Sequence, residues 1–367
     1  MLLIVSSGVN LARRYGTAGA SRLRERIDAL SRGLVSEAGK VYLAFPDDSV
    51  SATTYGFRAI AMNSSALVAR AIWALQSAVG FTSGDALLIV GGHEIVPFAE
   101  LSNPAAGGID PDIVIQSDNP YGFSSGRAAE AFQAGAVPDY AVGRLPDFEP
   151  ANIEDFAALV DSISGPVRSR NGTFAVVNEA WFSPTAQVLD GLGTIRTTPP
   201  WSASNAEWKT QNAQLLYFNL HGFNSEDTWK GFDDGTGNWC NAISPADVVA
   251  EAVSGSIVFA ENCYAALVTG KSCSNSVALS MLTCGVRAFV GSTGMAYGSF
   301  MQQPTTPIEA DVLGGDFVRR LREGEPAGQA LALARSDFSE MTSDEWNADR
   351  YKTISEFVLY GNPLATL

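Results

Sequence analysis

Apolar runs of strand length alternate with amphipathic stretches along most of the chain. Uninterrupted apolar runs predict eight strands, at residues 2–6, 41–45, 86–90, 140–142, 173–178, 215–220, 256–260 and 287–291. Between them, apolar positions repeat at helical spacing in residues 21–32, 65–79, 153–163, 245–253, 276–283, 309–322 and 327–336. Strands without polar alternation are buried on both faces. The pattern therefore predicts an α/β protein with three α/β/α layers and mostly parallel sheets.

Two irregular stretches and one junction divide this series of elements. Residues 101–138 are rich in Gly, Pro, Asn and Asp and are predicted to form a long loop region, and residues 222–245 form a second irregular stretch. The pattern of strands and helices divides near Ser164, Gly165 and Pro166. We therefore predict two α/β units, residues 1–165 and residues 166–367, with no sequence repeat between them.

Composition and charge narrow the classes of protein that fit this chain. Of its 367 residues 46% are hydrophobic, so the chain can bury a large core. Its net charge of −15 and the lack of a basic stripe argue against a nucleic-acid partner. The apolar runs are far shorter than the roughly 20 residues that span a membrane, so no membrane span is expected. The first residues lack the basic start of a signal peptide, so we expect a cytoplasmic protein, or a secreted one if the sequence is trimmed.

Cysteine and histidine usage argues against a bound metal. The four cysteines include no C-x-x-C pair and the chain has two histidines, so a zinc site is not expected. Residues 232–238 are acidic and rich in glycine, and oxygen ligands of this kind suit calcium. The segment lacks the spacing of a helix–loop–helix calcium site, so we expect an exposed turn, with calcium as the alternative. No other cofactor is expected.

A histidine and a cysteine each follow a predicted buried strand. His221 comes directly after residues 215–220, and Cys263, 42 residues further along, follows residues 256–260. In an open parallel sheet, ligands bind at the carboxyl ends of the strands. A helix at residues 245–253 makes the right-handed crossover that would place both strands in one sheet. An imidazole can activate a thiol for nucleophilic attack, and the amide groups of Gly222 and Cys263 could bind a developing oxyanion.

The pattern alone leaves structural roles open for both residues. Cysteine is among the most buried residue types, and a histidine at a strand end is often a polar cap. His93 competes with His221, because it also follows a buried strand, at residues 86–90. If that strand belongs to the first unit, His93 is remote from Cys263 and has a structural role.

The His-Gly and Cys signatures, together with four further segments, resemble a known group of cysteine peptidases. An apolar run followed by His-Gly, and another followed by x-x-Cys, resemble the caspase-like clan. Within that clan the gingipain family is resembled, in order, by residues 86–97, by Ser-Asp-Asn-Pro-Tyr at 117–121, by residues 138–146 with Gly-Arg-Leu, and by residues 357–363 with Tyr-Gly-Asn-Pro. Asn362 replaces the usual Asp of that last segment. The matches cover residues 86–367.

The resemblance implies two caspase-like subdomains, of which the second carries a catalytic dyad. His221 matches the catalytic histidine of the family, and Cys263 matches its nucleophile. The family's acidic residue that orients the imidazole is matched by Glu179, directly after the strand at residues 173–178. The implied activity is that of a cysteine endopeptidase, with a peptide or protein as substrate.

The resemblance also places a specificity pocket beside the cysteine, between residues 181–187 and residues 292–299. Family members that cut after Arg or Lys have a carboxylate at the base of this pocket. Residues 181–187 contain no carboxylate, and Asp190 is the nearest one. A basic residue before the cut is the default expectation, with an apolar or small residue as the alternative. The candidate substrate-binding residues are Asn262, Ser292, Thr293, Tyr297 and Asp190.

Three functions therefore stay open at this point. The first is a cysteine endopeptidase, which the presence of both His221 and Cys263 favours. The second is a non-catalytic caspase-like module that binds a partner through the same edge of the sheet. The third is a cysteine-dependent transferase or amidohydrolase that acts on a small molecule.

Overall fold

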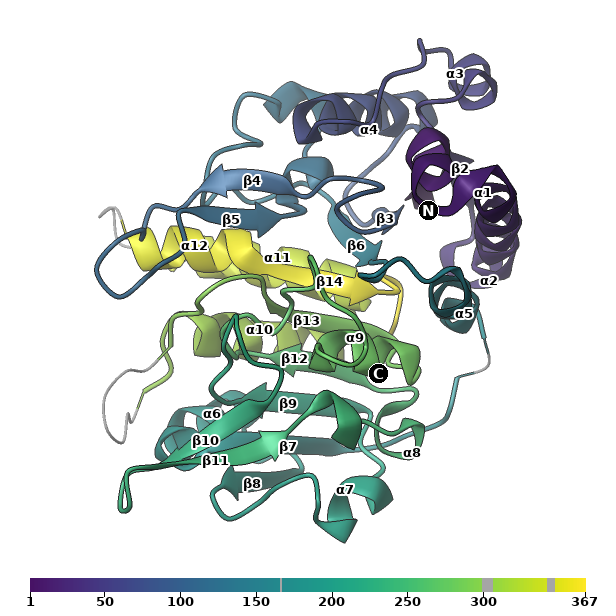
Figure 1. Cartoon of the computed structure of the whole chain (residues 1–367). Helices are drawn as coiled ribbons and strands as arrows, with labels where there is room; N and C mark the ends of the chain where they lie inside the picture. The colour runs from purple at the N-terminus through teal and green to yellow at the C-terminus, as the bar shows by residue number, and fades with distance from the viewer. Residues whose placement is uncertain (166, 299–305, 342–346) are drawn as a thin grey trace.

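One sheet of ten strands forms the centre of the protein in a computed structural model that describes residues 1–165, 167–298, 306–341 and 347–367 (Figure 1). The strand order is β2-β1-β3-β6-β14-β13-β12-β9-β7-β8, and every neighbouring pair is parallel except β13 and β14. The bounds of its strands are β1 Leu2–Val5, β2 Val41–Ala44, β3 Ala86–Val90, β6 Ala141–Leu145, β7 Thr173–Asn178, β8 Thr194–Thr198, β9 Leu215–Asn219, β12 Ile257–Ala260, β13 Ala288–Ser292 and β14 Phe357–Gly361. The predicted α/β fold with a mostly parallel sheet is confirmed.

Helices pack on both faces of this sheet. The longer ones are α1 Gly8–Gly33, α4 Ser65–Val79, α5 Ile153–Ile163, α9 Val277–Thr283, α10 Ala310–Arg322, α11 Ala327–Glu340 and α12 Ala348–Glu356. The shorter ones are α2 Val35–Ala38, α3 Ser49–Tyr55, α6 Phe182–Leu189, α7 Ala206–Thr210, α8 Ala250–Val253, and the 3₁₀ turns η1 Asn119–Gly122, η2 Ser125–Arg127, η3 Glu179–Trp181 and η4 Pro245–Asp247. None of the described helices is long and apolar enough to cross a membrane.

Alternation along the strands explains the two helical layers. On β9, Leu216 and Phe218 belong to a core shared with α1, α4, α5 and α9, whereas Leu215 and Tyr217 belong to a second core shared with α10 and α11. Successive strand residues point to opposite faces. A strand with no polar position therefore needs a helix on each side, as the uninterrupted apolar runs predict.

Local signals in the sequence set the helix ends. The Ser64 hydroxyl accepts a hydrogen bond from the Leu67 amide at the start of α4, and Gly80 ends the helix with a φ of 71°. The predicted helices at residues 65–79 and 153–163 have these bounds in the structure. Two other helix predictions were wrong in extent. Helix α1 begins at Gly8, well before residue 21, and the crossover at residues 245–253 is broken into η4 and α8.

The structure contains strands where the sequence predicted loops. Residues 101–138 include part of a hairpin of β4 (Ala99–Ser102) and β5 (Val114–Ser117), and a second hairpin is formed by β10 (Trp229–Asp233) and β11 (Asn238–Ile243). These short strands carry exposed polar positions, which hide them from a search for apolar runs. The sequence pattern also failed to predict strands β8 and β14.

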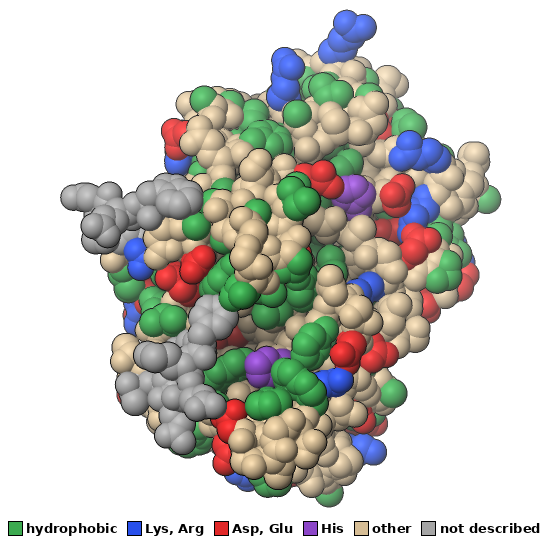
Figure 2. Space-filling view, turned by 60° about the vertical axis from the view of Figure 1, so that its left-hand side comes forward, with side chains coloured by type: hydrophobic (Ala, Val, Ile, Leu, Met, Phe, Trp, Pro, Cys, Tyr) green, Lys and Arg blue, Asp and Glu red, His purple; other side chains and the backbone are tan. Residues whose placement is uncertain are grey.

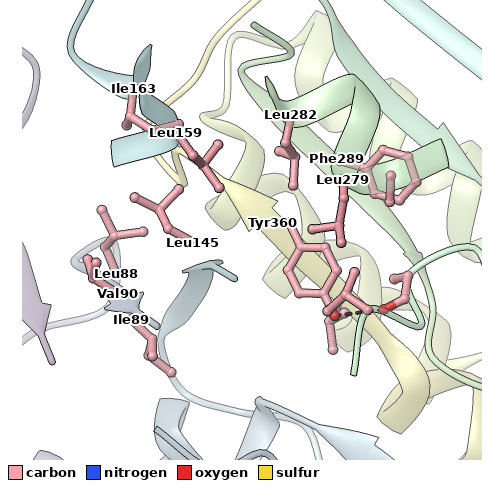
Figure 3. Close-up of a cluster of buried hydrophobic side chains, with 14 of the residues drawn as sticks. Leu88, Ile89, Val90, Leu145, Leu159, Ile163, Leu279, Leu282, Phe289 and Tyr360 are labelled. Atoms are coloured by element: carbon pink, nitrogen blue, oxygen red, sulfur yellow. Dashed lines mark hydrogen bonds between the residues drawn. The ribbon is translucent and has the colours of Figure 1, made fainter. Parts of the chain in front are cut away.

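The two predicted units share the sheet and a core. Strands from residues 1–165 form the β2-β1-β3-β6 side, and strands from residues 166–367 form the rest. Figure 3 shows Leu145 and Leu159 of the first part in the same buried cluster as Leu279, Leu282 and Tyr360 of the second. Strand β14 lies between β6 and β13, so the C-terminal strand joins the two sides. The division into two units near residue 165 stays a prediction, and Pro166 lies outside the described residues.

Candidate active site

Neighbouring strands deliver His221 and Cys263 to the same edge of the sheet. Strands β9 and β12 are paired in parallel, with Phe218 opposite Ala260. His221 and Cys263 each lie three residues beyond this pair. Both side chains line one cavity of about 120 Å³, together with Trp181, Asn219, Leu220, Glu261, Ala296, Tyr297, Gly298 and Ala310. The predicted pairing of the two strands is confirmed, and the two side chains share one cavity.

Gly222 lets these two strand ends approach each other closely. A Cβ atom at Gly222 would lie 2.0 Å from the carbonyl oxygen of Cys263, a distance that no side chain tolerates. Asn262 joins the same strand ends, because its Oδ1 accepts a hydrogen bond from the Leu220 amide at 2.8 Å. The backbone at residue 222 lies so close to the backbone of Cys263 that only glycine fits there.

The imidazole of His221 is held by backbone bonds and by two tryptophan rings. The His221 amide donates to the Lys230 carbonyl at 2.8 Å, and the Lys230 amide donates back at 2.9 Å, which fixes His221 against β10. The imidazole centroid lies 4.5 Å from that of Trp181 and 4.8 Å from that of Trp239. Burial between these rings lowers the pKa of His221 to about 4, so the imidazole is uncharged at neutral pH.

The thiol of Cys263 also rests in its neutral form. Burial raises the pKa of Cys263 to about 11, and the sulfur donates a long hydrogen bond of 3.6 Å to the Ala296 carbonyl. Tyr264, the next residue, has a φ of 57°, so the chain turns sharply just after the cysteine. Among the described residues, neither the Gly222 amide nor the Cys263 amide donates to a carbonyl or carboxylate. In the described part of the chain these two N–H groups therefore have no such acceptor, as the predicted oxyanion site requires.

Glu179 lies at the same edge of the sheet but does not bind the imidazole in this structure. It begins η3 directly after β7, the neighbour of β9, and its side chain is exposed. Within the described part of the chain it makes no hydrogen bond or ion pair with His221, whose ring contacts Trp181 instead. The orienting role of Glu179 stays a prediction.

Glu261, which lines the cavity, forms a buried pair of carboxyl groups with Asp311, and sequence reasoning missed this pair. Glu261 lines the cavity, and its side chain accepts a hydrogen bond from the Tyr217 hydroxyl. Burial and the neighbouring carboxyl of Asp311 raise the pKa of Glu261 well above its usual value. Asp311 in turn accepts a hydrogen bond of 3.1 Å from Asn219. A signal was present, because Glu261 places a charge at the end of the apolar run at residues 256–260.

The predicted substrate-binding residues fall into three groups. Tyr297 lines the cavity. Ser292 and Thr293 are buried, and their hydroxyls donate to the carbonyls of Gly294 and Gln116, while Asn262 is buried in the contact described above. Asp190 follows α6 and lines a different cavity, beside Arg319. Ser299, at the end of the predicted specificity loop, lies outside the described residues.

His93 and the acidic segment at residues 232–238 do not join this site. His93 follows β3, which is separated from β12 by three strands, so at about 4.8 Å a strand they are roughly 19 Å apart. In the acidic segment, Asp233 Oδ1 accepts hydrogen bonds from the amides of Gly235 and Thr236 at the tip of the β10–β11 hairpin. No group of three or more His, Cys, Asp or Glu side chains in the described residues could hold a metal ion. Calcium binding there, the alternative to the expected exposed turn, stays untested.

These features define an α/β protein with a thiol, an imidazole and two free amide groups at adjoining strand ends. On the face shown in Figure 2, histidine side chains appear above and below a recess that is lined with hydrophobic side chains.

Comparisons with known proteins support the fold. No family model and no curated protein matches the chain. A solved structure titled "Structure of Protease" matches 100% of this chain and 78% of its own, with a TM-score of 0.56 and 13% sequence identity. At this identity the likeness shows that the two chains share a fold.

Two further solved structures match with TM-scores below 0.5. The separase–securin complex of Saccharomyces cerevisiae matches with a TM-score of 0.39 and 10% identity, over 79% of this chain and 17% of that chain. Dimeric latent PorU from Porphyromonas gingivalis matches with a TM-score of 0.41 and 12% identity, over 99% of this chain and 30% of that chain. The chain thus spans less than a third of either protein.

Proposed function

We propose that this protein is a cysteine endopeptidase of the caspase-like type. The observation that carries the proposal is the register of β9 and β12, which brings His221 and Cys263 into one cavity beside two free amide groups. A nucleophile, a proton carrier and an oxyanion site are the groups that hydrolysis of an amide requires. The neighbour with the same fold is itself titled a protease.

In the proposed mechanism, Cys263 attacks the carbonyl carbon of the scissile bond. His221 takes the thiol proton as the sulfur–carbon bond forms, and the amides of Gly222 and Cys263 bind the negative oxygen. His221 then gives the proton to the departing amine, which leaves a thioester. Water, activated by the same imidazole, hydrolyses the thioester and restores the thiol. Glu179 is the proposed orienting carboxylate.

The neutral resting state of the dyad has a consequence for this mechanism. With the pKa of Cys263 near 11 and that of His221 near 4, an ion pair is not formed in the free protein. The thiol must lose its proton as attack occurs, while the bound substrate excludes water. The free thiol is therefore expected to react slowly with small alkylating reagents and faster with a peptide-based probe.

The carboxyl pair favours a basic residue before the cut. The described lining of the cavity contains the acidic Glu261 and no Lys or Arg. Glu261 lies beside Asp311, and two adjacent buried carboxyl groups cannot both ionise without a cation. A Lys or Arg side chain of the substrate would supply that cation. Glu261 thereby takes the place that the sequence assigned to Asp190.

Profiling with a mixed peptide library tests both parts of the proposal. The wild-type protein is expected to cleave peptides, with Lys or Arg enriched before the cut, and Cys263→Ala is expected to lose at least about a thousandfold in rate. Glu261→Gln should reduce the preference for basic residues about tenfold or more while cleavage continues. Cys284→Ala is the matched control, because Cys284 is also a half-buried thiol whose pKa burial raises.

A thiol-directed peptide probe separates this function from a partner-binding role. A peptidase is expected to react at Cys263 far faster than at Cys240, Cys273 or Cys284. Equal labelling of the four cysteines, with no cleavage of any library peptide, would overturn the proposal and leave a non-catalytic binding module.

A further inference from the structure

Lys352 on α12 is a fully buried lysine that lies among three acidic side chains. Its Nζ lies 2.5 Å from Asp110 Oδ2, 3.4 Å from Asp112 Oδ2 and 3.7 Å from Glu356 Oε2, and its side chain is 0% exposed. Asp110 and Asp112 come from the segment between β4 and β5, in the N-terminal half of the chain. The cluster therefore joins the N-terminal half to the last helix. Burial of a charged lysine costs free energy, which ion pairs with neighbouring carboxylates offset only in part.

The two aspartates of this cluster anchor the loop that follows β13. Asp112 Oδ2 accepts a hydrogen bond from the Met295 amide at 2.8 Å. Asp110 Oδ2 accepts one from the Tyr297 hydroxyl at 3.0 Å. The residue between them, Ala296, is the one whose carbonyl contacts the sulfur of Cys263. The cluster thus binds Met295 and Tyr297, the two neighbours of Ala296, whose carbonyl contacts the thiol of Cys263.

A second connection runs to the residue after the cysteine. The Tyr264 hydroxyl donates to Asp112 Oδ1 at 3.2 Å, and the Tyr264 amide donates to the Gly294 carbonyl at 2.7 Å. Tyr264 is in the left-handed conformation, which costs free energy unless surrounding contacts hold it. The ammonium of Lys352 also lies 5.4 Å from the ring centroid of Tyr297.

We propose that Lys352 is a positioning residue for Cys263. Its buried ammonium neutralises Asp110 and Asp112, and these two aspartates hold residues 294–297 and Tyr264 around the thiol. The proposal rests on the proposed function in taking Cys263 as the nucleophile. It adds that the N-terminal half of the chain, through two aspartates, supports the reaction without touching the substrate.

The electrostatics of the cluster agree with this geometry. Burial is the largest effect on the pKa of Cys263 and raises it, Glu356 raises it further, and Lys352 lowers it. Burial raises the pKa of Glu356 to about 8, so this carboxyl is mostly neutral at pH 7 and ionised above pH 8. Although burial opposes it, Glu356 and Asp110 raise the pKa of Lys352, which therefore stays charged. Asp349, whose pKa burial and Asp110 raise, is a further acidic group near Lys352 among the described residues.

Alkylation of Cys263 by iodoacetamide, followed by mass spectrometry between pH 7 and pH 10, tests the proposal without requiring turnover. Lys352→Met is expected to slow alkylation about tenfold at pH 8, which corresponds to a rise of about one unit in the pKa of the thiol. Glu356→Gln is expected to leave the rate unchanged at pH 7 and to raise it about threefold at pH 9.5. Slower alkylation in Lys352→Met and faster alkylation in Glu356→Gln would show that the charges of these two side chains act on the thiol.

A remote control is available in Lys40, an exposed lysine that lies 4.7 Å from the ring centroid of Tyr42, next to the edge strand β2. Lys40→Met should leave alkylation unchanged. Because Lys352→Met leaves Asp110 without its cation, the double variant Lys352→Met/Asp110→Asn is measured too, with thermal unfolding to confirm that it folds. The folded double variant is expected to retain the slow alkylation.

Peptide cleavage supplies the second readout. If the proposed function holds, Lys352→Met and Tyr297→Phe should lower kcat about tenfold, and Lys352→Met should change KM less than threefold. If no peptide is cleaved but the alkylation rates change as stated, the peptidase function fails while the positioning role stands. The role is overturned if both charge variants change alkylation in the same direction, if neither does, or if the folded double variant regains the wild-type rate.

Discussion

The two histidines of the chain occupy matching places in the two halves of the sheet, and only one of them meets a thiol. His93 follows β3 and His221 follows β9, each three residues beyond a residue that is paired with the neighbouring strand. The equivalent position on the neighbouring strand is Phe148 in the N-terminal half and Cys263 in the C-terminal half. The same backbone arrangement thus occurs at two places, which we call corners. The N-terminal corner, with His93 and Phe148, has a structural role, and the C-terminal corner, with His221 and Cys263, is the candidate active site.

The two corners differ in how their polar groups are bonded. In the N-terminal corner, His93 Nδ1 accepts a hydrogen bond from the Phe98 amide at 3.3 Å. Asp147 beside it is bound by the Gly92 amide and the Tyr15 hydroxyl, each at 3.0 Å, and by Arg14. In the C-terminal corner, tryptophan rings enclose the imidazole and two amides stay free. Reactive chemistry is expected where polar groups are positioned but not already satisfied by the protein itself.

Exchange of each histidine for alanine gives the largest expected contrast between the corners. His221→Ala should lower kcat for peptide cleavage about 10²–10⁴-fold, because it removes the group that carries the proton in both steps. His93→Ala should change kcat less than threefold, since three strands separate its strand β3 from β12. Steady-state cleavage of a library-selected peptide measures both. Comparable losses in the two variants would show that the corners have been assigned wrongly.

The sequence could predict the elements of the C-terminal corner because apolar strands and the residues directly after them are local signals. His221, Gly222 and Cys263 follow runs that read as buried strands, and the pairing of β9 with β12 follows from a right-handed crossover. The contact between Asp110 and Lys352 could not be predicted from the sequence, because 242 residues separate them. Their meeting depends on a hairpin with exposed polar positions and on a C-terminal strand that enters the middle of the sheet.

The same limit explains the surroundings of the imidazole. Trp239 lies on β11, in a stretch that the sequence marks only as irregular, and it reaches His221 because β10 pairs with the histidine backbone. Nothing in the order of residues indicates that a hairpin folds over a strand end. Tertiary contacts of this kind decide the pKa of the histidine, and the sequence therefore identifies the group without its protonation state.

Substitution of the two corner glycines is expected to give a smaller contrast. Gly222→Ala places a Cβ against the Cys263 carbonyl, where only 2.0 Å is available, so the strand ends must move apart. A displacement of about 1 Å at a reacting group can lower the rate about a hundredfold. Gly92→Ala meets Asp147 Oδ1 at 2.1 Å, which should lower the melting temperature but leave kcat within about threefold of wild type. If both variants fall equally in kcat at a temperature where both are folded, Gly222 has no special role.

The smallest expected effect is a dependence of stability on pH that belongs to one corner. Burial lowers the pKa of His221 from its usual value to about 4, so between pH 6.5 and pH 4 the unfolded chain binds a proton that the folded protein does not. The free energy of unfolding should therefore fall as the pH is lowered through this range, by about 1–2 kcal/mol between pH 7 and pH 5 for a partly exposed ring. His221→Phe keeps an aromatic ring between Trp181 and Trp239 and should lose this part of the pH dependence, whereas His93→Phe should retain it. Urea unfolding at pH 7 and pH 5 measures the difference, and an unchanged pH dependence in His221→Phe would mean that the tryptophan rings do not keep the imidazole neutral.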